Sequence, residues 1–310
     1  MNDTSYCNAG APRRIKAGFF ERTVFAGRRI LLAGLAGFAV MAAAAVSSQA
    51  GTLAEIKARG VLNVVTEDDF YPYEFITNGA PDGFHKDIVE ELRKYAPFKV
   101  KQDPIPWSSL LASVTAGKYD VAITGAGVTA ERLATFDYVS PISIDTTYYI
   151  KRANDDRIKS LKDLNGLTVG VQAGSAQLAR LTQLDEKLKA TGGKLGKVVQ
   201  YPSYPEIYAD LANGRLDYVV NSVVNASVLV REKPIFALGE PIAGTAFIAW
   251  PVAKGNEDLL EYLTGFVKHL RETGKLEELQ KKWFGMTFPN LPQEPIKTPE
   301  QMSKLAAEYK

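Results

Sequence analysis

The pattern that most constrains this chain begins after Gly51, where short runs rich in β-branched residues alternate with stretches of helical periodicity. Val61 to Thr66 has the composition of a strand, and between Phe84 and Tyr95 apolar residues recur at helical spacing with charges between them. The helical spacing returns from Trp107 to Gly117, before a largely apolar run from Tyr119 to Thr124. Strands that alternate with helices predict an α/β architecture.

The alternation starts again near Lys151. The predicted elements are a strand from Leu167 to Val171, a helix from Ser175, a strand from Lys197 to Tyr201, a helix from Glu206 to Ala212 and a strand from Leu216 to Val220. Because each step from strand to helix is short, parallel crossovers are expected in both sets. The sequence therefore predicts two lobes, each a mixed sheet flanked by helices.

The last predicted elements have no sheet of their own. A strand from Ala246 to Val252 is followed by two helices through Phe266 and Trp283. We expect them to return to the first lobe, so that the chain crosses between the lobes near Tyr148 and near Gly244 and forms a two-strand hinge. The predicted divisions are a first lobe of residues 51–147 and 247–290, a second lobe of residues 148–246 with the hinge crossings, and a loose C-terminal tail of residues 291–310.

The first fifty residues have the organisation of an export signal. Six basic residues precede an uncharged run from Ile30 to Val46, and small residues follow at Ser48-Gln49-Ala50. We expect a signal peptide of residues 1–50, cleaved after Ala50, and a periplasmic mature protein; the alternative is a retained membrane anchor. Arg28-Arg29 leaves the twin-arginine route open. Cys7 lies upstream of the apolar run, so it is not the lipidated residue that follows a cleavage site.

The composition excludes several classes of function. Loss of residues 1–50 changes 37 basic and 35 acidic residues to 31 and 33. A nearly neutral protein without a basic run argues against nucleic acid or an anionic membrane as the main partner. Cys7 is the only cysteine and lies in the expected signal, which leaves no thiol for a disulfide, a nucleophile or a thiolate metal site. No cofactor, metal site or serine-nucleophile motif is indicated.

The loop from Thr124 to Arg132 is a candidate ligand site, because ligands of open α/β sheets bind beyond the carboxyl ends of strands. Arg132 has paired donors that match a carboxylate, and Thr129 lies at a predicted helix start. The loop also resembles a dinucleotide fingerprint, with Asp145 some twenty residues later. Pro141 leaves room for only a short helix, which argues against a nucleotide site.

Two further loops follow predicted strands. In the loop from Gln172 to Gln177, Gly174 allows close approach of the backbone and Ser175 opens a helix. The loop from Glu67 to Tyr73 is acidic and aromatic. Its carboxylates are either contacts for a cationic or hydroxylated ligand tail or solvated surface groups.

The order and spacing of seven segments between Leu53 and Phe284 carry a resemblance to a known family. They are Thr66–Phe75, Gly83–Phe84 with Asp87, Trp107–Asp120, Gly127–Arg132 followed by Ser140–Pro141, Val169–Gly174, Gly214–Asp217 and Lys282–Phe284. Together they resemble the family 3 extracellular solute-binding proteins for polar amino acids. The resemblance implies a type II periplasmic-binding fold, a monomer, a small-molecule ligand with a carboxylate, and an ABC permease in the inner membrane as partner.

The resemblance also implies roles for individual residues. In the family, the arginine that matches Arg132 clamps the ligand's α-carboxylate, the loop that matches Ser175 completes the grip, and aromatic residues at Phe70 and Trp107 form two walls. No catalytic residue is expected. The predicted ligand-binding residues are Glu67, Phe70, Trp107, Thr124, Gly125, Gly127, Thr129, Arg132, Gln172, Gly174, Ser175, Gln177, Asn221 and Ser222.

The sequence departs from the family pattern at the expected amine site. Many members place an aspartate for the ligand's ammonium group five residues after the position of Asp217, where this chain has Ser222. Gly125 and Gly127 replace hydroxyl residues that are common in amino-acid binders, so a wider wall is expected. A buried ammonium without its carboxylate costs several kcal/mol. We therefore expect a ligand whose nitrogen is substituted or absent, such as an opine-like conjugate.

The alternative function is a lyase of the same fold that resembles cyclohexadienyl dehydratase. Such an enzyme needs a carboxylate of raised pKa between the lobes, and Glu67 is the candidate. His85 follows Gly83-Phe84 and is expected on the surface at a helix start, without a metal.

Overall fold

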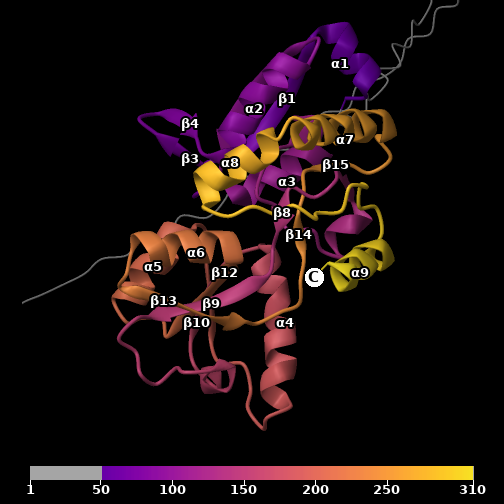
Figure 1. The fold of residues 1–310 in the computed structure, drawn as a ribbon. Coiled ribbons are helices and arrows are strands. Elements are labelled where there is room, and N and C mark those ends of the chain that lie inside the picture. Colours follow the sequence, from indigo (N-terminus) through magenta and orange to yellow (C-terminus); the bar gives the residue numbers. More distant parts are fainter. Residues whose placement is uncertain (1–50, 310) are drawn as a thin grey trace, which may run out of the picture. The chain divides into compact units, whose positions relative to one another are not determined.

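The computed structural model describes residues 51–309, and its elements gather around two five-stranded sheets (Figure 1). Cys7 and the expected cleavage after Ala50 lie outside the described residues.

The first sheet has the strand order β5, β1, β6, β15, β7. Its strands are β1 (Val61–Glu67), β5 (Lys99–Ile105), β6 (Val121–Ala122), β7 (Phe136–Tyr138) and β15 (Pro251–Ala253). β1 pairs in parallel with β5 and β6, whereas β15 pairs antiparallel with β6 and β7. The carboxyl ends of β1 and β6 therefore lie side by side, which brings together the loops that follow Glu67 and Ala122.

Five helices accompany this sheet. They are α1 (Leu53–Arg59), α2 (Phe84–Tyr95), α3 (Trp107–Thr115), α7 (Glu257–Glu272) and α8 (Lys275–Phe284). The apolar face predicted for α2 is buried at Phe84, Ile88 and Leu92. This helix ends before Pro97, because the residue that precedes a proline is disfavoured in the helical conformation.

The second sheet has the strand order β11, β10, β12, β9, β13. Its strands are β9 (Thr147–Arg152), β10 (Val169–Gln172), β11 (Val198–Tyr201), β12 (Tyr218–Ser222) and β13 (Phe236–Pro241). β10 pairs in parallel with β11 and β12, and β9 is antiparallel to β12 and β13. The accompanying helices are α4 (Ala176–Lys189), α5 (Tyr204–Ala212), α6 (Val223–Glu232) and the 3₁₀ turn η2 (Leu161–Leu164). The expected mixed sheets with flanking helices are confirmed.

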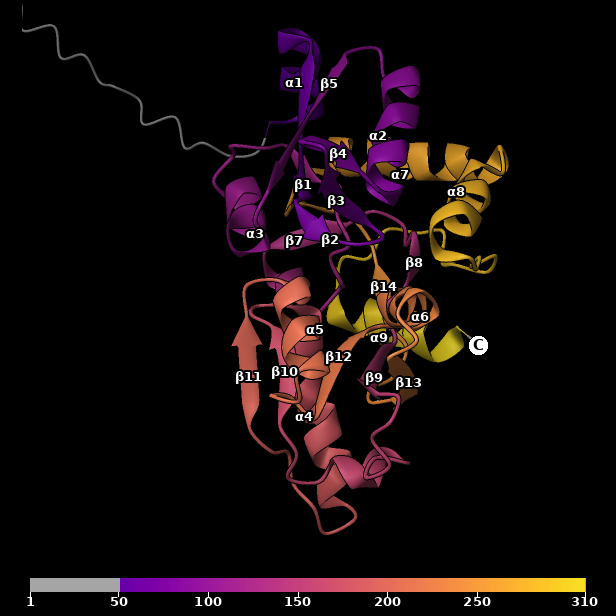
Figure 2. The same ribbon diagram turned by 90° about the vertical axis from the view of Figure 1, so that its left-hand side faces the viewer.

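Two short strands run between the sheets. β8 (Ser143–Ile144) and β14 (Phe247–Ile248) pair antiparallel, and both views in Figures 1 and 2 place them between the two five-stranded sheets. The single strand predicted from Ala246 to Val252 is thus divided: β14 pairs with β8, and β15 joins the first sheet. Ala249 and Trp250 lie between these strands, fully buried.

A small three-stranded sheet shapes the acidic and aromatic loop. It consists of β2 (Asp69–Phe70), β3 (Glu74–Thr77) and β4 (Ala80–Asp82), all paired antiparallel. The pairing of Phe70 with Glu74 holds the aromatic ring at the end of β1. A further 3₁₀ turn, η1 (Arg132–Ala134), follows the loop after β6.

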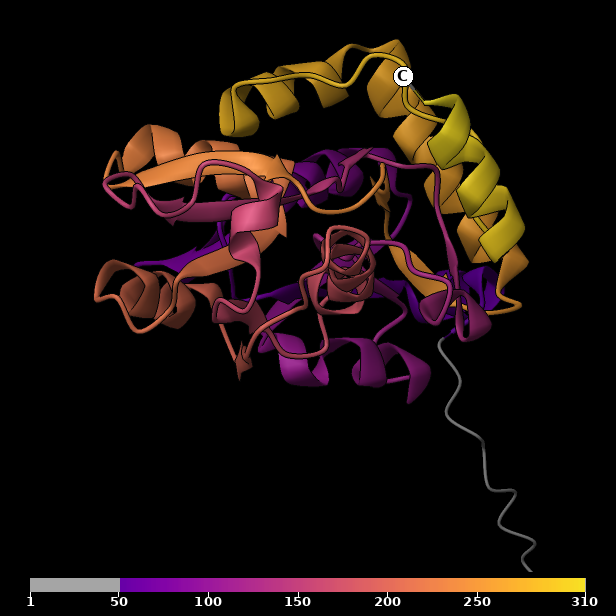
Figure 3. The same cartoon turned by 90° about the horizontal axis from the view of Figure 1, so that it is seen from below.

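The prediction of a loose tail is wrong. Leu291 and Ile296 are buried, and Ile296 exchanges two backbone hydrogen bonds of 2.9 Å with Tyr138. Helix α9 (Pro299–Glu308) follows, and the ring of Tyr309 lies 5.8 Å from that of Phe247. Figure 3 shows this segment in yellow, and Lys297, which precedes α9, forms a salt bridge with Glu257 of α7. The buried side chains of Leu291 and Ile296 therefore hold this proline-rich segment against the rest of the protein.

No helix among residues 51–309 combines the length and the apolar character needed to cross a membrane.

Candidate functional site

Arg132 joins the loop after β6 to the loop after β10. Its Nη1 donates to the carbonyl of Gly127 at 2.7 Å, and its Nη2 donates to the carbonyl of Gly174 at 2.9 Å. The guanidinium lies 5.0 Å from the ring centre of Trp107, a cation–π arrangement. The backbone N–H of Arg132 donates to Thr129 Oγ1 at 3.2 Å, which fixes the turn. Two loops from different sheets therefore meet at one cation.

Ser175 caps the helix that begins beside this arginine. Its Oγ accepts from the backbone N–H of Leu178 at 3.1 Å and donates to the carbonyl of Gln172 at 2.8 Å. Gly174 has a φ of 67°, a conformation that side chains disfavour. The first turn of α4 has backbone N–H groups without helical partners, so it favours an anion. A donor-rich helix start thus lies next to Arg132.

A small cavity lies where these loops meet, with a volume of about 10 Å³. It is lined by Glu67, Phe70, Trp107, Gly125, Gly127, Arg132, Gln172, Ser175, Ala176 and Gln177. All of these except Ala176 were predicted as ligand-binding residues. The volume has room for about one water molecule. An amino acid enters only if the two sides separate.

The other predicted residues do not line this cavity. Gly174 and Thr129 bond to Arg132, as described above. Thr124 is fully buried and its hydroxyl donates to Glu74. Asn221 and Ser222 are also fully buried; the amide of Asn221 donates to the hydroxyl of Tyr208 at 2.8 Å, and Ser222 caps α6.

Glu67 is a buried carboxylate that faces the cavity. Its side chain accepts from the amide of Gln172 at 2.8 Å, and the residue is 4 % exposed. Burial raises the pKa of the Glu67 carboxyl well above its ordinary range, the nearby charge of Glu74 raises it further, and the Gln172 hydrogen bond opposes both. Of the two interpretations that the sequence left open for this residue, the structure excludes the solvated one. Among the described residues, no cation forms a salt bridge with it.

The prediction of a surface position for His85 is wrong. The residue is fully buried, its Nδ1 faces the carboxylate of Glu74, and its Nε2 accepts from the indole N–H of Trp250 at 3.2 Å. Because an indole nitrogen only donates, the imidazole hydrogen is on Nδ1 and points to Glu74. Glu74 in turn accepts from the backbone N–H of Gly125 at 2.9 Å. These hydrogen bonds, which the sequence did not reveal, hold Glu74 and, through it, the backbone of Gly125 that lines the cavity.

The two glycines do not widen the wall in this conformation, contrary to expectation. A Cβ atom on Gly125 would lie 2.6 Å from the ring of Phe70. One on Gly127 would lie 2.1 Å from a carboxylate oxygen of Asp145 and 2.8 Å from the Cβ of Ala176. Neighbouring side chains fill the space that the missing side chains leave.

Comparison with known proteins identifies the family to which this chain belongs. Residues 62–286 match the sequence profile of the bacterial extracellular solute-binding proteins, family 3. The chain belongs to this family. It is 30% identical over 269 residues to the L-cystine-binding protein TcyJ of Escherichia coli, an alignment that covers 84% of this chain and 96% of that protein.

Other relatives of this family 3 protein include a binding protein and an enzyme. The structure of the amino acid ABC transporter substrate-binding protein AbpA from Streptococcus pneumoniae, bound to L-arginine, is 25% identical, covers 75% of this chain and 98% of its own, and has a TM-score of 0.67. The cyclohexadienyl dehydratase of Pseudomonas aeruginosa is 22% identical and covers 84% of this chain and 96% of its own. The expected type II periplasmic-binding fold is confirmed.

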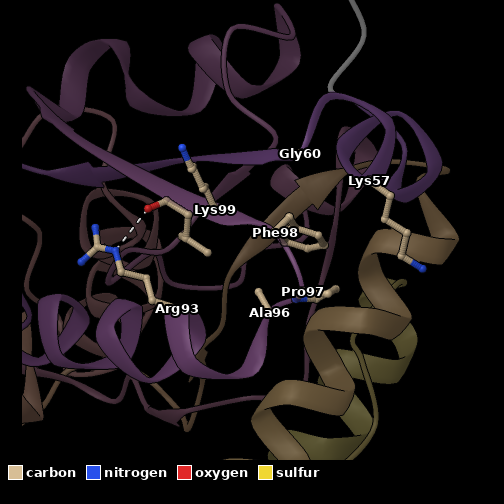
Figure 4. Close-up of a pocket in the computed structure, with 8 residues that line it drawn as sticks. Lys57, Gly60, Arg93, Ala96, Pro97, Phe98 and Lys99 are labelled. Atoms are coloured by element: carbon tan, nitrogen blue, oxygen red, sulfur yellow. Dashed lines mark hydrogen bonds between the residues drawn. The ribbon is translucent and has the colours of Figure 1, made fainter.

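A larger hollow on this family 3 protein lies away from the Arg132 loop. It has a volume of about 910 Å³ and lies beside the start of β5 (Figure 4). The basic side chains that line this hollow do not point toward a common centre. Those of Lys57 and Lys99 point in opposite directions, and Arg93 donates to the backbone carbonyl of Val100 at 3.2 Å. Volume alone therefore does not identify the site. Within residues 51–309, no group of side chains is arranged to hold a metal ion.

Proposed function

We propose that this chain is the solute-binding component of an ABC importer and captures a polar amino acid, or a modified one such as an opine-like conjugate, by its carboxylate. One observation supports this most strongly. Arg132 and Ser175, which belong to loops of different sheets, line the same cavity, and Arg132 bonds directly to the Ser175 loop through Gly174.

The bonds of Arg132 suggest how the carboxylate is held. Both carbonyls that the guanidinium contacts are neutral acceptors, and hydrogen bonds from a guanidinium to a carboxylate are stronger. A ligand carboxylate therefore replaces the carbonyl of Gly174 as acceptor, and the first turn of α4 donates from the other side. The ligand takes over a contact that otherwise joins the two loops.

Binding requires motion, because a cavity of about 10 Å³ does not admit an amino acid. We assign the first lobe to residues 51–147 and 247–290 and the second to residues 148–246. Tyr148, near which the sequence predicted the first crossing, lies within β9 of the second sheet, so we place the hinge just before it, at β8, and at β14. A ligand that contacts both lobes stabilises the closed form, which then docks on the permease.

Glu67 is proposed to receive the polar end of the ligand opposite the carboxylate. The Glu67 side-chain carboxylate faces the cavity, and among the described side chains its only hydrogen-bond partner is the Gln172 amide. A cationic or hydroxylated group on the ligand compensates for its burial. Trp107 and Phe70 form the walls on either side.

The N-terminal pattern and the family support a proposal for the compartment. We propose export through the signal of residues 1–50 and release into the periplasm as a monomer. The partner is an ABC permease of the inner membrane.

One observation favours a second candidate, a lyase like the cyclohexadienyl dehydratase relative. Glu67 has the raised pKa that an acid catalyst requires and faces the cavity. Incubation with a cyclohexadienyl carboxylate, followed by ultraviolet absorbance for an aromatic product, tests this candidate. We expect no turnover; turnover that Glu67→Gln abolishes would establish the lyase and refute a pure binding role.

A thermal-shift screen tests the proposed function. The purified protein, stripped of co-purified solutes, is screened against amino acids, opines and carboxylic acids without nitrogen, and each hit is titrated by calorimetry. A cognate ligand raises the melting temperature by mass action, by an amount that grows with its concentration. We expect hits only among molecules with a carboxylate. A ligand without a carboxylate that binds most tightly would refute the proposal.

A further inference from the structure

Asp145 and Arg180 form a buried ion pair directly behind the cavity. Arg180 Nη1 donates at 2.7 Å both to the carboxylate and to the backbone carbonyl of Asp145, and at 2.9 Å to the hydroxyl of Thr147. Asp145 is fully buried and Arg180 is 6 % exposed. Such a pair is costly to bury and adds little stability compared with apolar packing. A functional reason for its presence is therefore worth testing.

Two residues that line the cavity contact this pair. The amide of Gln177 donates to Asp145 at 3.0 Å, and the other carboxylate oxygen lies 2.1 Å from the place where a Cβ on Gly127 would be. A carboxylate accepts about four hydrogen bonds, and Gln177 and Arg180 supply one each. Asp145 therefore keeps acceptor capacity on the side of Gly127.

Arg180 also has, among the described residues, an unused donor on this side, which suits an acceptor atom of the ligand and not its amino group. Its Nη2 is buried and has no hydrogen-bond partner among the described residues. This nitrogen would lie 3.3 Å from a Cβ atom added to Gly127, so it also points toward the residue that lines the cavity. An acceptor and an unused donor thus lie together behind one glycine.

We propose that Asp145, positioned by Arg180 and Gln177, accepts a hydrogen bond from the protonated amino group of the bound ligand. The inference rests on the proposed function, since it concerns the same ligand. When the two sides separate, Ala176 moves away from Gly127, with which Asp145 shares the first lobe, and a path to the carboxylate opens. No carboxylate at the position of Ser222 is then needed, and the ligand retains a protonated nitrogen, primary or secondary.

The charges of the site are consistent with this assignment. Arg180 neutralises Asp145, so the pair adds no net charge to the cavity. A ligand with a carboxylate and an ammonium group therefore meets opposite charges at Arg132 and Asp145.

The test compares ligands that differ only by the amino group. Calorimetry measures binding of L-cystine against dithiodipropionic acid, and of L-arginine against delta-guanidinovaleric acid, which lack the amines. A hydrogen bond to a charged group predicts that the wild type prefers the amino acid of the pair that it binds by about 10-fold to 150-fold. In Asp145→Asn, the preference falls to within about threefold.

Two further variants separate this role from a structural one. Asp145→Asn leaves Arg180 without its charge partner, so the double variant Asp145→Asn with Arg180→Gln removes both charges and is expected to lose the same preference while remaining folded. Glu67→Gln removes the other buried carboxylate of the site and is expected to keep the amine preference, whatever its effect on overall affinity.

The outcomes are distinguishable. An amine preference that persists in the folded double variant, or that disappears in Glu67→Gln instead, would overturn the role of Asp145. Equal binding of both members of a pair by the wild type would also overturn it. If the wild type binds neither pair and no amino acid or opine in the broader screen, the proposed function itself fails.

Discussion

Substitution of Gly127 by alanine tests whether close contact between the two sides controls ligand affinity. The added Cβ would lie 2.1 Å from Asp145 Oδ2 and 2.8 Å from the Cβ of Ala176, both shorter than Cβ atoms tolerate. Asp145 does not yield easily, because Arg180 and Gln177 hold it. In the proposed division, Gly127 and Asp145 belong to the first lobe, whereas Ala176, Gln177 and Arg180 belong to the second. Separation of the lobes therefore removes the Ala176 contact and frees the Asp145 side chain to move aside, so the overpacking is confined to the closed form.

The magnitude follows from the cost of overpacking. One extra methyl group in a well-packed interior costs about 1–3 kcal/mol. If this penalty falls on the closed form alone, affinity decreases by about 5-fold to 150-fold. The protein remains folded, because the open form provides an unstrained alternative.

Calorimetry with the best ligand from the screen measures the affinity, and small-angle scattering of the protein without and with ligand reports the degree of closure. Gly244→Ala is the matched control, since a Cβ there meets no atom within 4 Å. Affinity equal to wild type in Gly127→Ala would refute the reasoning. So would an equal loss of affinity in the Gly244 variant.

Three further predictions follow from the contacts of single residues. Arg132→Ala lowers affinity by about 2 kcal/mol with little change in melting temperature, because a charge-assisted contact is lost; calorimetry that shows unchanged affinity would remove the carboxylate clamp. Burial raises the pKa of Glu67 above its ordinary 4.5, so the folded protein binds this proton more tightly and loses stability as pH rises above that value. Glu67→Gln is therefore expected to melt at a higher temperature than wild type at neutral pH, with the difference disappearing near about pH 4; a constant difference across this range would contradict the assignment. His85→Leu leaves the buried indole of Trp250 without an acceptor and removes one of the donors to the buried Glu74 carboxylate, which costs about 3–5 kcal/mol in denaturant unfolding. His269→Leu on an exposed helix face changes stability by about 0.5 kcal/mol or less.

Local patterns predicted several helices, although α1, α6 and α9 were not among them. The apolar spacing from Phe84 to Tyr95 gave α2 with the bounds that the structure has, because one face of that helix is buried and its end precedes a proline. The start of α4 at Ser175 was also predicted, since a serine cap and a preceding glycine are local signals. Ser222 was interpreted only as a missing aspartate, although it is likewise a helix cap.

Features that depend on distant partners were missed. His85 was placed on the surface as a residue at a helix start, yet its partners are Glu74 on a neighbouring strand and Trp250 far along the chain. Asp145 was considered only as part of a nucleotide fingerprint, and nothing in its neighbourhood indicates the pairing with Arg180. Periodicity shows which face of an element is apolar, but it does not show which buried polar groups meet.

The central claim is that Arg132 and the start of α4 together hold the carboxylate of the ligand. A crystal structure of the complex with the amino acid that gives the largest thermal shift tests this most directly. We predict that a carboxylate oxygen lies within hydrogen-bond distance of the Arg132 guanidinium and that the other oxygen meets backbone N–H groups at Ser175 or in the first turn of α4. A complex in which the carboxylate lies elsewhere, with Arg132 still bonded to the carbonyl of Gly174, would contradict the account.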